Sequence, residues 1–278
     1  MTKLKDKFWM WGYTQGKIPE EIPFVRTPSY CSLETAAQYF GMGNVVFMNG
    51  MHNIENINDQ HLGYLKNFNR VVCGLPHGEN TVQGALKVSE MSLQFPNISG
   101  AILDDFLQVG GHPMNIERMR DIRNALKSRN PALELYVVYY SDIDHEDLTP
   151  YLEYIDVINL WRWVSTEHFW RAESSPYIIR LKRETGKRII QGVYLQNYGE
   201  AGSSNPSPMD MGLWELQWLK IFNMLSHGIT TLQEGHYHIL DGCVLLQNGC
   251  CGHPAFREQV IWLKNNLDWF MGTNTDRN

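Results

Sequence analysis

The sequence lacks the features that mark several large classes of protein. Its 278 residues contain no run of about 18 apolar residues, so no transmembrane helix and no membrane partner is predicted. Neither G-x-G-x-x-G nor G-x-x-x-x-G-K-[ST] occurs, which argues against dinucleotide and P-loop chemistry. The first residues show no apolar stretch with a cleavage site. We therefore expect no signal peptide, and a cytoplasmic location is favoured unless a leader has been removed.

Cysteine and positive charge are also scarce. The five cysteines are an odd, sparse set without a C-x-x-C pair, so we expect reduced thiols rather than a disulfide framework or a zinc ribbon. Lysine and arginine number 24 against 30 aspartates and glutamates, which gives a formal net charge of −6. This acidic balance argues against a nucleic-acid partner, because such proteins normally carry a basic face.

The apolar residues that are present form a repeating pattern. They make up 43% of the chain and gather in eight short runs, most of them followed by a helical pattern. Runs that are apolar almost throughout are typical of strands buried on both faces of a parallel sheet. The runs predict strands at residues 8–13, 45–49, 70–74, 101–106, 135–140, 155–161, 188–194 and 229–234.

Helical periodicity follows between these strands, at residues 32–40, 81–94, 115–127, 166–185, 211–225 and 255–270. Eight strands alternating with helices predict the α/β class and a single (β/α)8 TIM barrel over residues 1–278. A doubly wound open sheet is the structural alternative. It usually needs a glycine-rich turn after the first strand, and the sequence has none there.

In a (β/α)8 barrel the functional residues lie at the carboxyl ends of the strands and in the loops that follow. Carboxylates there supply an acid, a base or a nucleophile, and flat aromatic rings pack against the C–H faces of sugars. This combination favours a neutral polyhydroxylated substrate over a phosphate ester, which needs more cationic groups. The candidate substrate-binding residues are Trp11, Tyr13, Asn49, His77, Tyr140, Trp161, Arg162, Trp163, Tyr194, Gln196, His236 and His238.

The sharpest signal is a pair of acids at the end of the fourth predicted strand, Asp104 and Asp105. Adjacent acids directly after an apolar strand are costly unless they are solvated, paired or functional. Because side chains alternate along a strand, one of the two is expected to face the lumen, and the sequence does not say which. In the competing interpretation, one acid faces the mouth while the other caps the next helix or binds a loop amide.

Two further acids are candidates for a second catalytic carboxylate. Glu234 ends the eighth predicted strand, and a salt bridge at the barrel rim is its competing interpretation. Asp142 follows the fifth strand, in an acidic segment that is also typical of a helix start. Strands four and eight are opposite each other, so that pairing predicts a wide gap between carboxylates and inversion. A pairing of strands four and five is compatible with retention.

His236 and His238 form an H-x-H pair close to Glu234. With Asp104 and His77 they would supply nitrogen and oxygen ligands of the kind that bind metals, so a metal-dependent hydrolase or isomerase is one alternative function. Barrels of metal-dependent amidohydrolases typically place H-x-H after the first strand, where this chain has Trp-Gly-Tyr. Under the favoured function we expect no metal and no cofactor.

The stretch from Ser99 to Phe106, SGAILDDF, resembles the strand-four Gly-x-x-x-Asp-Asp-Tyr/Phe signature of glycoside-hydrolase-like barrels, and the aromatic strand ends are similar too. The large retaining clan carries glutamates after strands four and seven, where this chain has the two aspartates and then Gln196 and Asn197. The DxxDxDxE pattern of chitinase-like barrels is also absent. The resemblance implies a TIM barrel with glycosidase activity.

These observations together predict an enzyme, a glycosidase that acts on a neutral oligo- or polysaccharide by carboxylate acid–base catalysis. Asp104 or Asp105 would act on one side of the scissile bond, and Glu234 or Asp142 on the other. A non-catalytic carbohydrate-binding barrel is the second alternative. The expected partner is a carbohydrate, and the sequence carries no signal for an oligomeric state.

Overall fold

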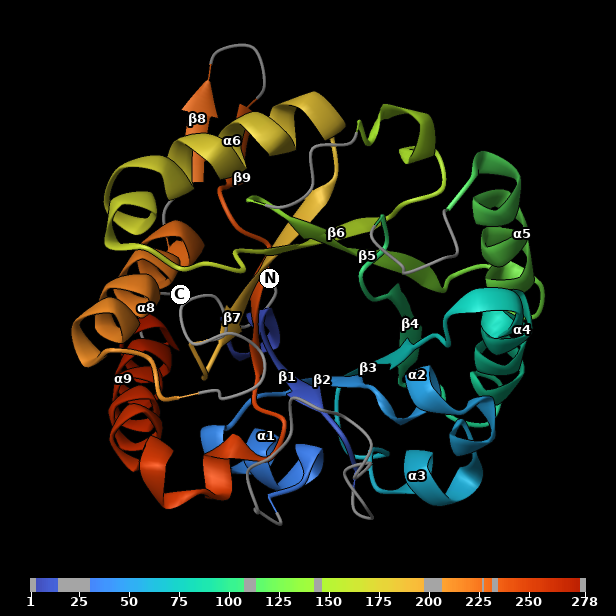
Figure 1. Ribbon diagram of the computed structural model, residues 1–278, viewed down its shortest axis with the longest axis horizontal. Coiled ribbons are helices and arrows are strands. Elements are labelled where there is room, and N and C mark those ends of the chain that lie inside the picture. Colours follow the sequence, from blue (N-terminus) through green and yellow to red (C-terminus); the bar gives the residue numbers. More distant parts are fainter. Residues whose placement is uncertain are drawn as a thin grey trace.

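The computed structural model describes residues 4–14, 31–107, 114–142, 147–197, 207–226, 228–231 and 235–275, with the backbone alone for residues 4–5, 228–231, 235–238 and 273–275. Eight strands form a closed barrel in the order β1-β10-β7-β6-β5-β4-β3-β2, and every neighbouring pair is parallel. Helices surround this barrel (Figure 1). The prediction of a (β/α)8 TIM barrel is confirmed.

The barrel strands are β1 (Phe8–Gly12), β2 (Asn44–Phe47), β3 (Arg70–Gly74), β4 (Ile98–Leu103), β5 (Glu134–Tyr140), β6 (Val157–Trp161), β7 (Arg188–Tyr194) and β10 (Gly242–Leu246). The described α-helices are α1 (Leu33–Phe40), α2 (Asn49–His52), α3 (Asp59–Gly63), α4 (Thr81–Met91), α5 (Ile116–Lys127), α6 (Ser174–Thr185), α8 (Met211–Ser226) and α9 (Arg257–Thr275). A π-helical turn, Phe169–Glu173, leads into α6. Short 3-10 turns lie at Leu4–Lys7, Ile54–Asn56, Gly78–Asn80, Thr149–Tyr151, Cys250–Gly252 and Pro254–Phe256.

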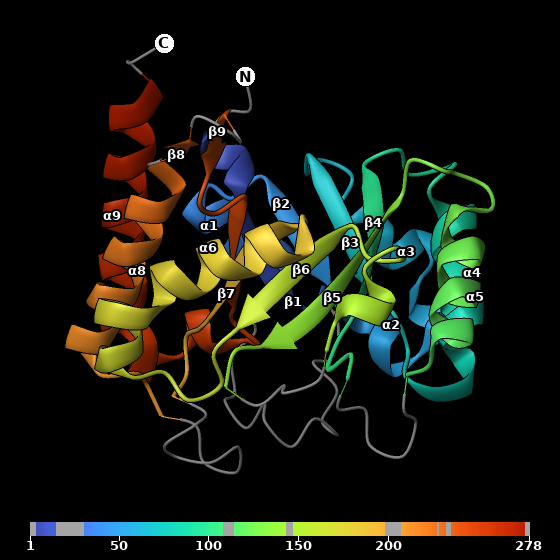
Figure 2. The same cartoon turned by 90° about the horizontal axis from the view of Figure 1, so that it is seen from above.

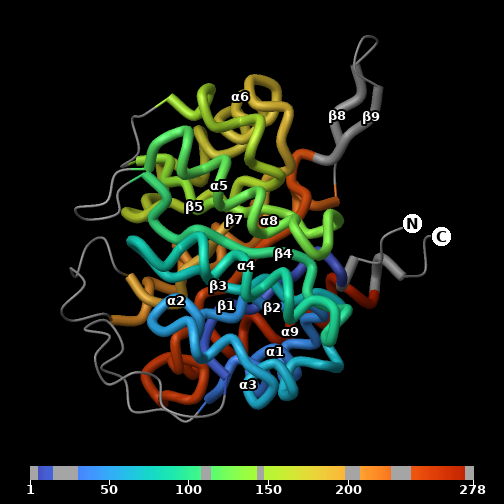
Figure 3. Tube along the Cα trace, turned by 90° about the vertical axis from the view of Figure 1, so that its right-hand side faces the viewer, coloured from blue at the N-terminus to red at the C-terminus, as the bar shows by residue number. Residues whose placement is uncertain are grey.

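Local sequence signals explain where several helices begin and end. The Ser32 hydroxyl accepts the backbone N–H of Thr35 (3.4 Å) at the start of α1, and Gly41 ends the helix with a φ of 70°. The Asn115 side chain caps α5 in the same way, by accepting the N–H of Arg118 (2.8 Å). Helices α4 and α5 then pack side by side on one flank of the barrel (Figure 3). Among the helices described, none is long and apolar enough to cross a membrane.

The prediction that residues 229–234 form the eighth barrel strand is wrong. β8 (Gly228–Thr231) and β9 (Gly235–His238) pair antiparallel as a separate two-stranded sheet, and β10 closes the barrel between β7 and β1. Just before β10, the N–H of Asp241 donates to the carbonyl of Ile189 at the start of β7 (2.9 Å). The β8–β9 sheet therefore lies at the amino end of the barrel, opposite to the arrowheads of β5 and β6 in Figure 2.

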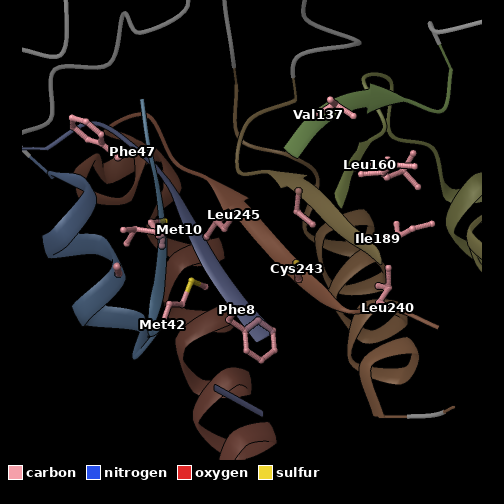
Figure 4. Close-up of a cluster of buried hydrophobic side chains, with 14 of the residues drawn as sticks. Phe8, Met10, Met42, Phe47, Val137, Leu160, Ile189, Leu240, Cys243 and Leu245 are labelled. Carbon is pink, nitrogen blue, oxygen red and sulfur yellow. The ribbon is translucent and has the colours of Figure 1, made fainter. Parts of the chain in front are cut away.

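Alternation along the strands divides the core into two layers. Side chains on one face of each strand pack against the helices, and Figure 4 shows several of them, including Phe8, Met10 and Cys243 on β1 and β10. Side chains on the other face fill the lumen, as expected for strands that are buried on both sides. The lumen residues include Trp9, Trp11, Val72, Ile102, Tyr136, Val138, Tyr140, Trp161, Ile190, Tyr194 and Val244.

An ion-pair cluster closes the amino end of the lumen. The two carboxylate oxygens of Glu134 each lie 2.5 Å from an arginine, Arg70 on one side and Arg188 on the other. The Tyr136 hydroxyl donates to the same carboxylate (2.9 Å), and the Arg70 guanidinium lies over the ring of Trp9 (5.3 Å). Polar groups at this end of a TIM barrel stabilise the fold, so we assign this cluster to stability.

At the other end, the fold depends on the absence of a side chain at Gly192. A Cβ atom there would lie 2.1 Å from Cδ2 of Trp161, because the indole ring crosses the neighbouring strand at that point. Trp161 is fully buried, and its ring packs against Tyr194 with centroids 4.6 Å apart. Gly192 therefore allows the large aromatic rings at the top of the lumen to pack.

We expect Gly192→Ala to lower the free energy of unfolding by about 3 kcal/mol, because overpacking forces buried rings out of place. Urea denaturation measures this. Gly63→Ala is the matched control, since nothing lies within 4 Å of the added Cβ in α3. Its stability should stay within about 1 kcal/mol of the wild type. Equal losses in the two variants would contradict the role assigned to Gly192.

Candidate functional site

Five aromatic rings gather at the carboxyl end of the lumen. Trp11 packs edge-on against Trp161 (centroids 5.6 Å apart, 82°), and Trp161 packs against Tyr194. Trp163, which follows β6, stands nearly perpendicular to Tyr194 (5.7 Å, 89°) and to Tyr140 (6.4 Å, 88°). The structure thus brings together five of the predicted substrate-binding residues from β1, β5, β6 and β7. Trp163 is the most exposed of the five.

Asp105 joins this aromatic cluster directly. The hydroxyl of Tyr140 donates a hydrogen bond to Oδ1 of Asp105 (2.8 Å). Asp105 has a φ of 44°, in the left-handed region that few residues other than glycine adopt. Strain of this kind persists where surrounding contacts impose it, and it recurs at functional sites. The turn after β4 therefore directs the Asp105 carboxylate toward the tyrosine in the lumen.

Asp104 lies in a different environment from its neighbour. Its carboxylate accepts the backbone N–H of Asp105 (3.2 Å), and the residue lines a narrow crevice together with His77 and Arg118. Burial, and next the negative charge of Asp105, raise the pKa of the Asp104 carboxyl well above its usual value. Neither acid forms an ion pair with any residue that the structure describes.

Both acids act electrostatically on Tyr140. Burial is the largest cause that raises the pKa of the Tyr140 hydroxyl well above its usual value, and Tyr194, Asp104 and Asp105 add to it. The hydroxyl is therefore held in its protonated form, as a hydrogen-bond donor. Asp104 and Asp105 lie at the same end of the lumen as the ring cluster, as expected for residues that follow a barrel strand.

Asp142 supports the loop after β6. Its Oδ1 accepts the N–H of Trp163 (3.0 Å), its Oδ2 accepts the N–H of Val164 (2.8 Å), and Oδ2 lies 3.6 Å from Nε of Arg162. Both oxygens are thus committed to the turn at residues 162–164. This is a structural role, as in the competing interpretation of Asp142, but the carboxylate binds the loop after β6 and not the start of a helix. It fixes the backbone that carries the Trp163 ring.

Arg162 turns away from the mouth. Its Nε donates to the carbonyl of Val164 (3.0 Å), and its guanidinium lies over the ring of Phe169 (4.6 Å). The side chain therefore stabilises its own loop. A substrate contact by Arg162 stays a prediction without support from these contacts.

The remaining binding candidates at the first, second and seventh strands engage protein groups. Oδ1 of Asn49 accepts the N–H of Thr14 (3.0 Å), and the Tyr13 hydroxyl lies 2.9 Å from Nε2 of His52. Nε2 of Gln196 lies 2.7 Å from the sulfur of Cys250, and Gln196 is fully buried. These contacts order the loops around the mouth.

The histidines predicted at the eighth strand do not lie at this end of the barrel. Glu234 lies outside the described residues. His236 and His238 belong to β9, whose backbone lies at the amino end of the barrel, whereas Asp104 lies at the carboxyl end. A metal site that combines the H-x-H pair with a strand-four acid is therefore not formed. Within the described part of the chain, no group of three or more His, Cys, Asp or Glu residues is arranged to hold a metal ion.

The sequence analysis did not identify the segment that follows β10, the eighth strand of the barrel. Gln247 comes directly after β10, and it is fully buried. Its N–H donates to the carbonyl of Trp11 (3.3 Å), and its Oε1 accepts the N–H of Gly249 (2.7 Å). Thr14, after β1, places its hydroxyl 2.7 Å from Nδ1 of His61. The apolar run at 242–246, followed by Gln-Asn-Gly, is the signal that could have located Gln247.

No family model and no curated protein sequence matches the chain. Solved structures match it over most of its length. An alpha-L-fucosidase-like protein of Bacteroides thetaiotaomicron is 10% identical with a TM-score of 0.59, over 94% of this chain and 92% of that one. A tryptophan synthase alpha-subunit variant of Pyrococcus furiosus is 11% identical with a TM-score of 0.53, over 98% and 100%. A psychrophilic family 10 endo-beta-1,4-xylanase is 12% identical with a TM-score of 0.51, over 89% of each. These likenesses show the TIM-barrel fold, which glycoside hydrolases share with other enzymes.

The raised pKa of Asp104 gives a pH-dependent stability prediction. Below the ordinary aspartate value of 3.8, both the folded and the unfolded chain hold the proton. Between that value and the raised pKa, the unfolded chain has released its proton while the folded chain still holds it. The folded state therefore loses about 1.4 kcal/mol of stability with each rise of one pH unit in this window. We expect Asp104→Asn to gain stability over the wild type as the pH rises from the ordinary aspartate value toward the raised pKa of Asp104, measured by urea denaturation.

Asp147→Asn is the control of opposite sign. Hydrogen bonds from Thr149 lower the pKa of Asp147, so this variant should lose stability relative to the wild type as the pH rises. A difference between Asp104→Asn and the wild type that does not change with pH would contradict the burial of the Asp104 carboxyl.

The Asp142 contacts predict a spectroscopic change. We expect Asp142→Ala to release the 162–164 turn, so that its near-ultraviolet circular dichroism approaches that of Trp163→Phe. The loss of an acceptor for two amides should also cost about 2 kcal/mol of stability. Asp241→Ala is the control, because that carboxylate accepts the N–H of Ile189 (2.9 Å) at the amino end. It should lose stability without the spectral change, and an unaltered spectrum in Asp142→Ala would contradict the role of Asp142.

Proposed function

We propose that the protein is a glycoside hydrolase that cleaves a neutral oligo- or polysaccharide at the carboxyl end of the barrel. The observation that supports this most is the contrast between two adjacent acids. Asp104 is half-buried with a raised pKa, and the neighbouring Asp105 accepts a hydrogen bond from Tyr140. Two carboxyls whose environments separate their protonation states are the arrangement from which acid and base roles arise.

In the proposed reaction Asp104 is the general acid. It donates its proton to the glycosidic oxygen while the bond from that oxygen to the anomeric carbon breaks. A water molecule adds to the anomeric carbon and gives its proton to Asp105. The pair ends with the proton on Asp105 instead of Asp104, and exchange with solvent restores the starting state. Tyr140 holds the Asp105 carboxylate in place through its hydroxyl.

The ring cluster supplies the sugar-binding surface in this proposal. Trp163 is partly exposed at the mouth, and the rings of Tyr140 and Tyr194 support it from below. A flat indole face packs against the C–H face of a pyranose with little loss of side-chain entropy. The named activities of the fucosidase-like and xylanase structures are consistent with a glycosidase on this fold. Fold alone does not decide the reaction, so the acid pair carries the proposal.

The leaving group of the substrate separates the roles of the two acids. We expect Asp104→Asn to lower kcat on oligosaccharides by about 1,000-fold, the usual scale of general acid catalysis. On 2,4-dinitrophenyl glycosides, whose leaving group needs no proton, the loss should stay within about tenfold. Asp105→Asn should lose activity on both. The activity of the wild type should fall at high pH as Asp104 ionises. This decrease at high pH should disappear when Asp104→Asn acts on the 2,4-dinitrophenyl glycosides.

Asp241→Asn is the matched control, because it makes the same chemical change at the amino end of the barrel. It should retain wild-type turnover. Full activity in both Asp104→Asn and Asp105→Asn would remove the strand-four acids from the mechanism. Saturable oligosaccharide binding by the wild type with no turnover would instead identify a carbohydrate-binding barrel.

A further inference from the structure

A cavity lies between the segments that follow β6 and β7, which also carry rings of the cluster at the mouth. It has a volume of about 380 Å³, within the range of small-molecule sites. Its lining comes from the segment after β6, from the segment after β7 and from the start of α8. The lining includes Ser165, Glu167, Arg171, Asn197, Asp210 and Leu216.

The walls of this cavity are fixed by buried hydrogen bonds. The Ser165 hydroxyl donates to Oε1 of Gln217 in α8 (3.0 Å) and accepts the indole N–H of Trp170 (2.7 Å). All three side chains are buried. The segment after β6 is thereby joined to α8 across the base of the cavity. A binding site with walls held in this way loses little entropy when a ligand enters.

The chemistry of the lining suits hydroxyl groups better than an anion. Glu167 and Arg171 pair with each other (2.5 Å), so the one guanidinium in the lining is already neutralised. Asp210 leaves a second carboxylate at the rim, where it caps α8 by accepting the N–H of Leu213 (3.1 Å). A phosphate or sulfate would meet uncompensated negative charge there. Amide and carboxylate oxygens beside leucine side chains instead match the hydroxyls and the C–H face of a sugar.

The chain connects this cavity to the mouth on two sides. Ser165 comes two residues after Trp163, and Asn197 comes three residues after Tyr194. The two aromatic residues pack against each other at the mouth. A ligand that extends outward past this aromatic pair therefore reaches the cavity next. Asp142 contributes to this arrangement, because its carboxylate binds the turn at residues 162–164. This turn carries Trp163 and leads directly to Ser165 in the cavity wall.

We propose that this cavity is a distal subsite for a further sugar unit of the same chain whose bond is cleaved at Asp104 and Asp105. The inference rests on the proposed function for the identity of the ligand. The subsite implies that the substrate is a chain of several sugar units, because a single sugar at the two acids would leave the cavity unused. Affinity should then rise with the number of sugar units, and this gain should depend on the cavity.

Leu216→Trp tests the subsite by filling it. The matched control is Leu219→Trp, the same substitution in the same helix at a residue that is 54% exposed and outside the cavity lining. Calorimetric titrations would use xylohexaose, cellohexaose, mannohexaose and maltohexaose. For the hexasaccharide that binds the wild type, we expect Leu216→Trp to raise Kd by about tenfold or more, and Leu219→Trp to stay within about twofold. The matching trisaccharide should bind the three proteins alike.

The titrations measure binding independently of cleavage. Failure of the proposed subsite can therefore be distinguished from failure of the proposed hydrolase activity. Hexasaccharide binding that depends on the cavity, without cleavage, would overturn the hydrolase and keep the subsite. Cleavage with no gain in affinity from trisaccharide to hexasaccharide would overturn the subsite and keep the hydrolase. Equal weakening of short and long ligands by Leu216→Trp, or binding of none of the four hexasaccharides, would also overturn the subsite.

Discussion

The pairing of β1 with β10 closes a ring of parallel strands, and the position of the candidate site follows from that closure. Because every pair is parallel, all eight carboxyl ends open on one side of the barrel. Residues as far apart in the chain as Trp11, Asp105 and Tyr194 meet there for this reason. The same closure places the Glu134 ion-pair cluster at the opposite end, where it seals the lumen. Stability and chemistry are thus separated along the barrel axis.

Burial at the carboxyl end gives the acids their distinct properties. Large aromatic rings fill the lumen below them, and Gly192 makes room for the indole ring of Trp161. In such a poorly solvated place a second negative charge is unfavourable, and the pKa of Asp104 rises as a result. Asp105 has a left-handed backbone conformation, and its carboxylate accepts a hydrogen bond from Tyr140. Its hydrogen-bond partner therefore differs from that of Asp104. In the proposed function, the same physical setting that costs stability prepares Asp104 as a proton donor.

Periodicity in the sequence predicted seven barrel strands, because buried parallel strands leave near-continuous apolar runs. It failed at residues 229–234, where a β-branched run pairs with the segment that follows it rather than with the barrel. Strand propensity is local, and it does not report which partner a strand takes. Alternation from Ile102 would place Asp104 on the lumen face, but strand geometry stops at Leu103, so alternation does not fix the direction of the Asp104 side chain. The contacts of Asp142 join residues that are 21 and 22 positions apart, which no local pattern reveals.

The proposed chemistry depends on Asp104, whose pKa is raised by burial and by the negative charge of the neighbouring Asp105. Carbon-13 NMR of labelled aspartate side chains, titrated in the wild type and in Asp105→Asn, measures this directly. We expect Asp104 to titrate well above the usual range in the wild type, and its pKa to fall once the negative charge of Asp105 is removed. An ordinary aspartate pKa for Asp104 in both proteins would show that this carboxyl is not prepared as a proton donor.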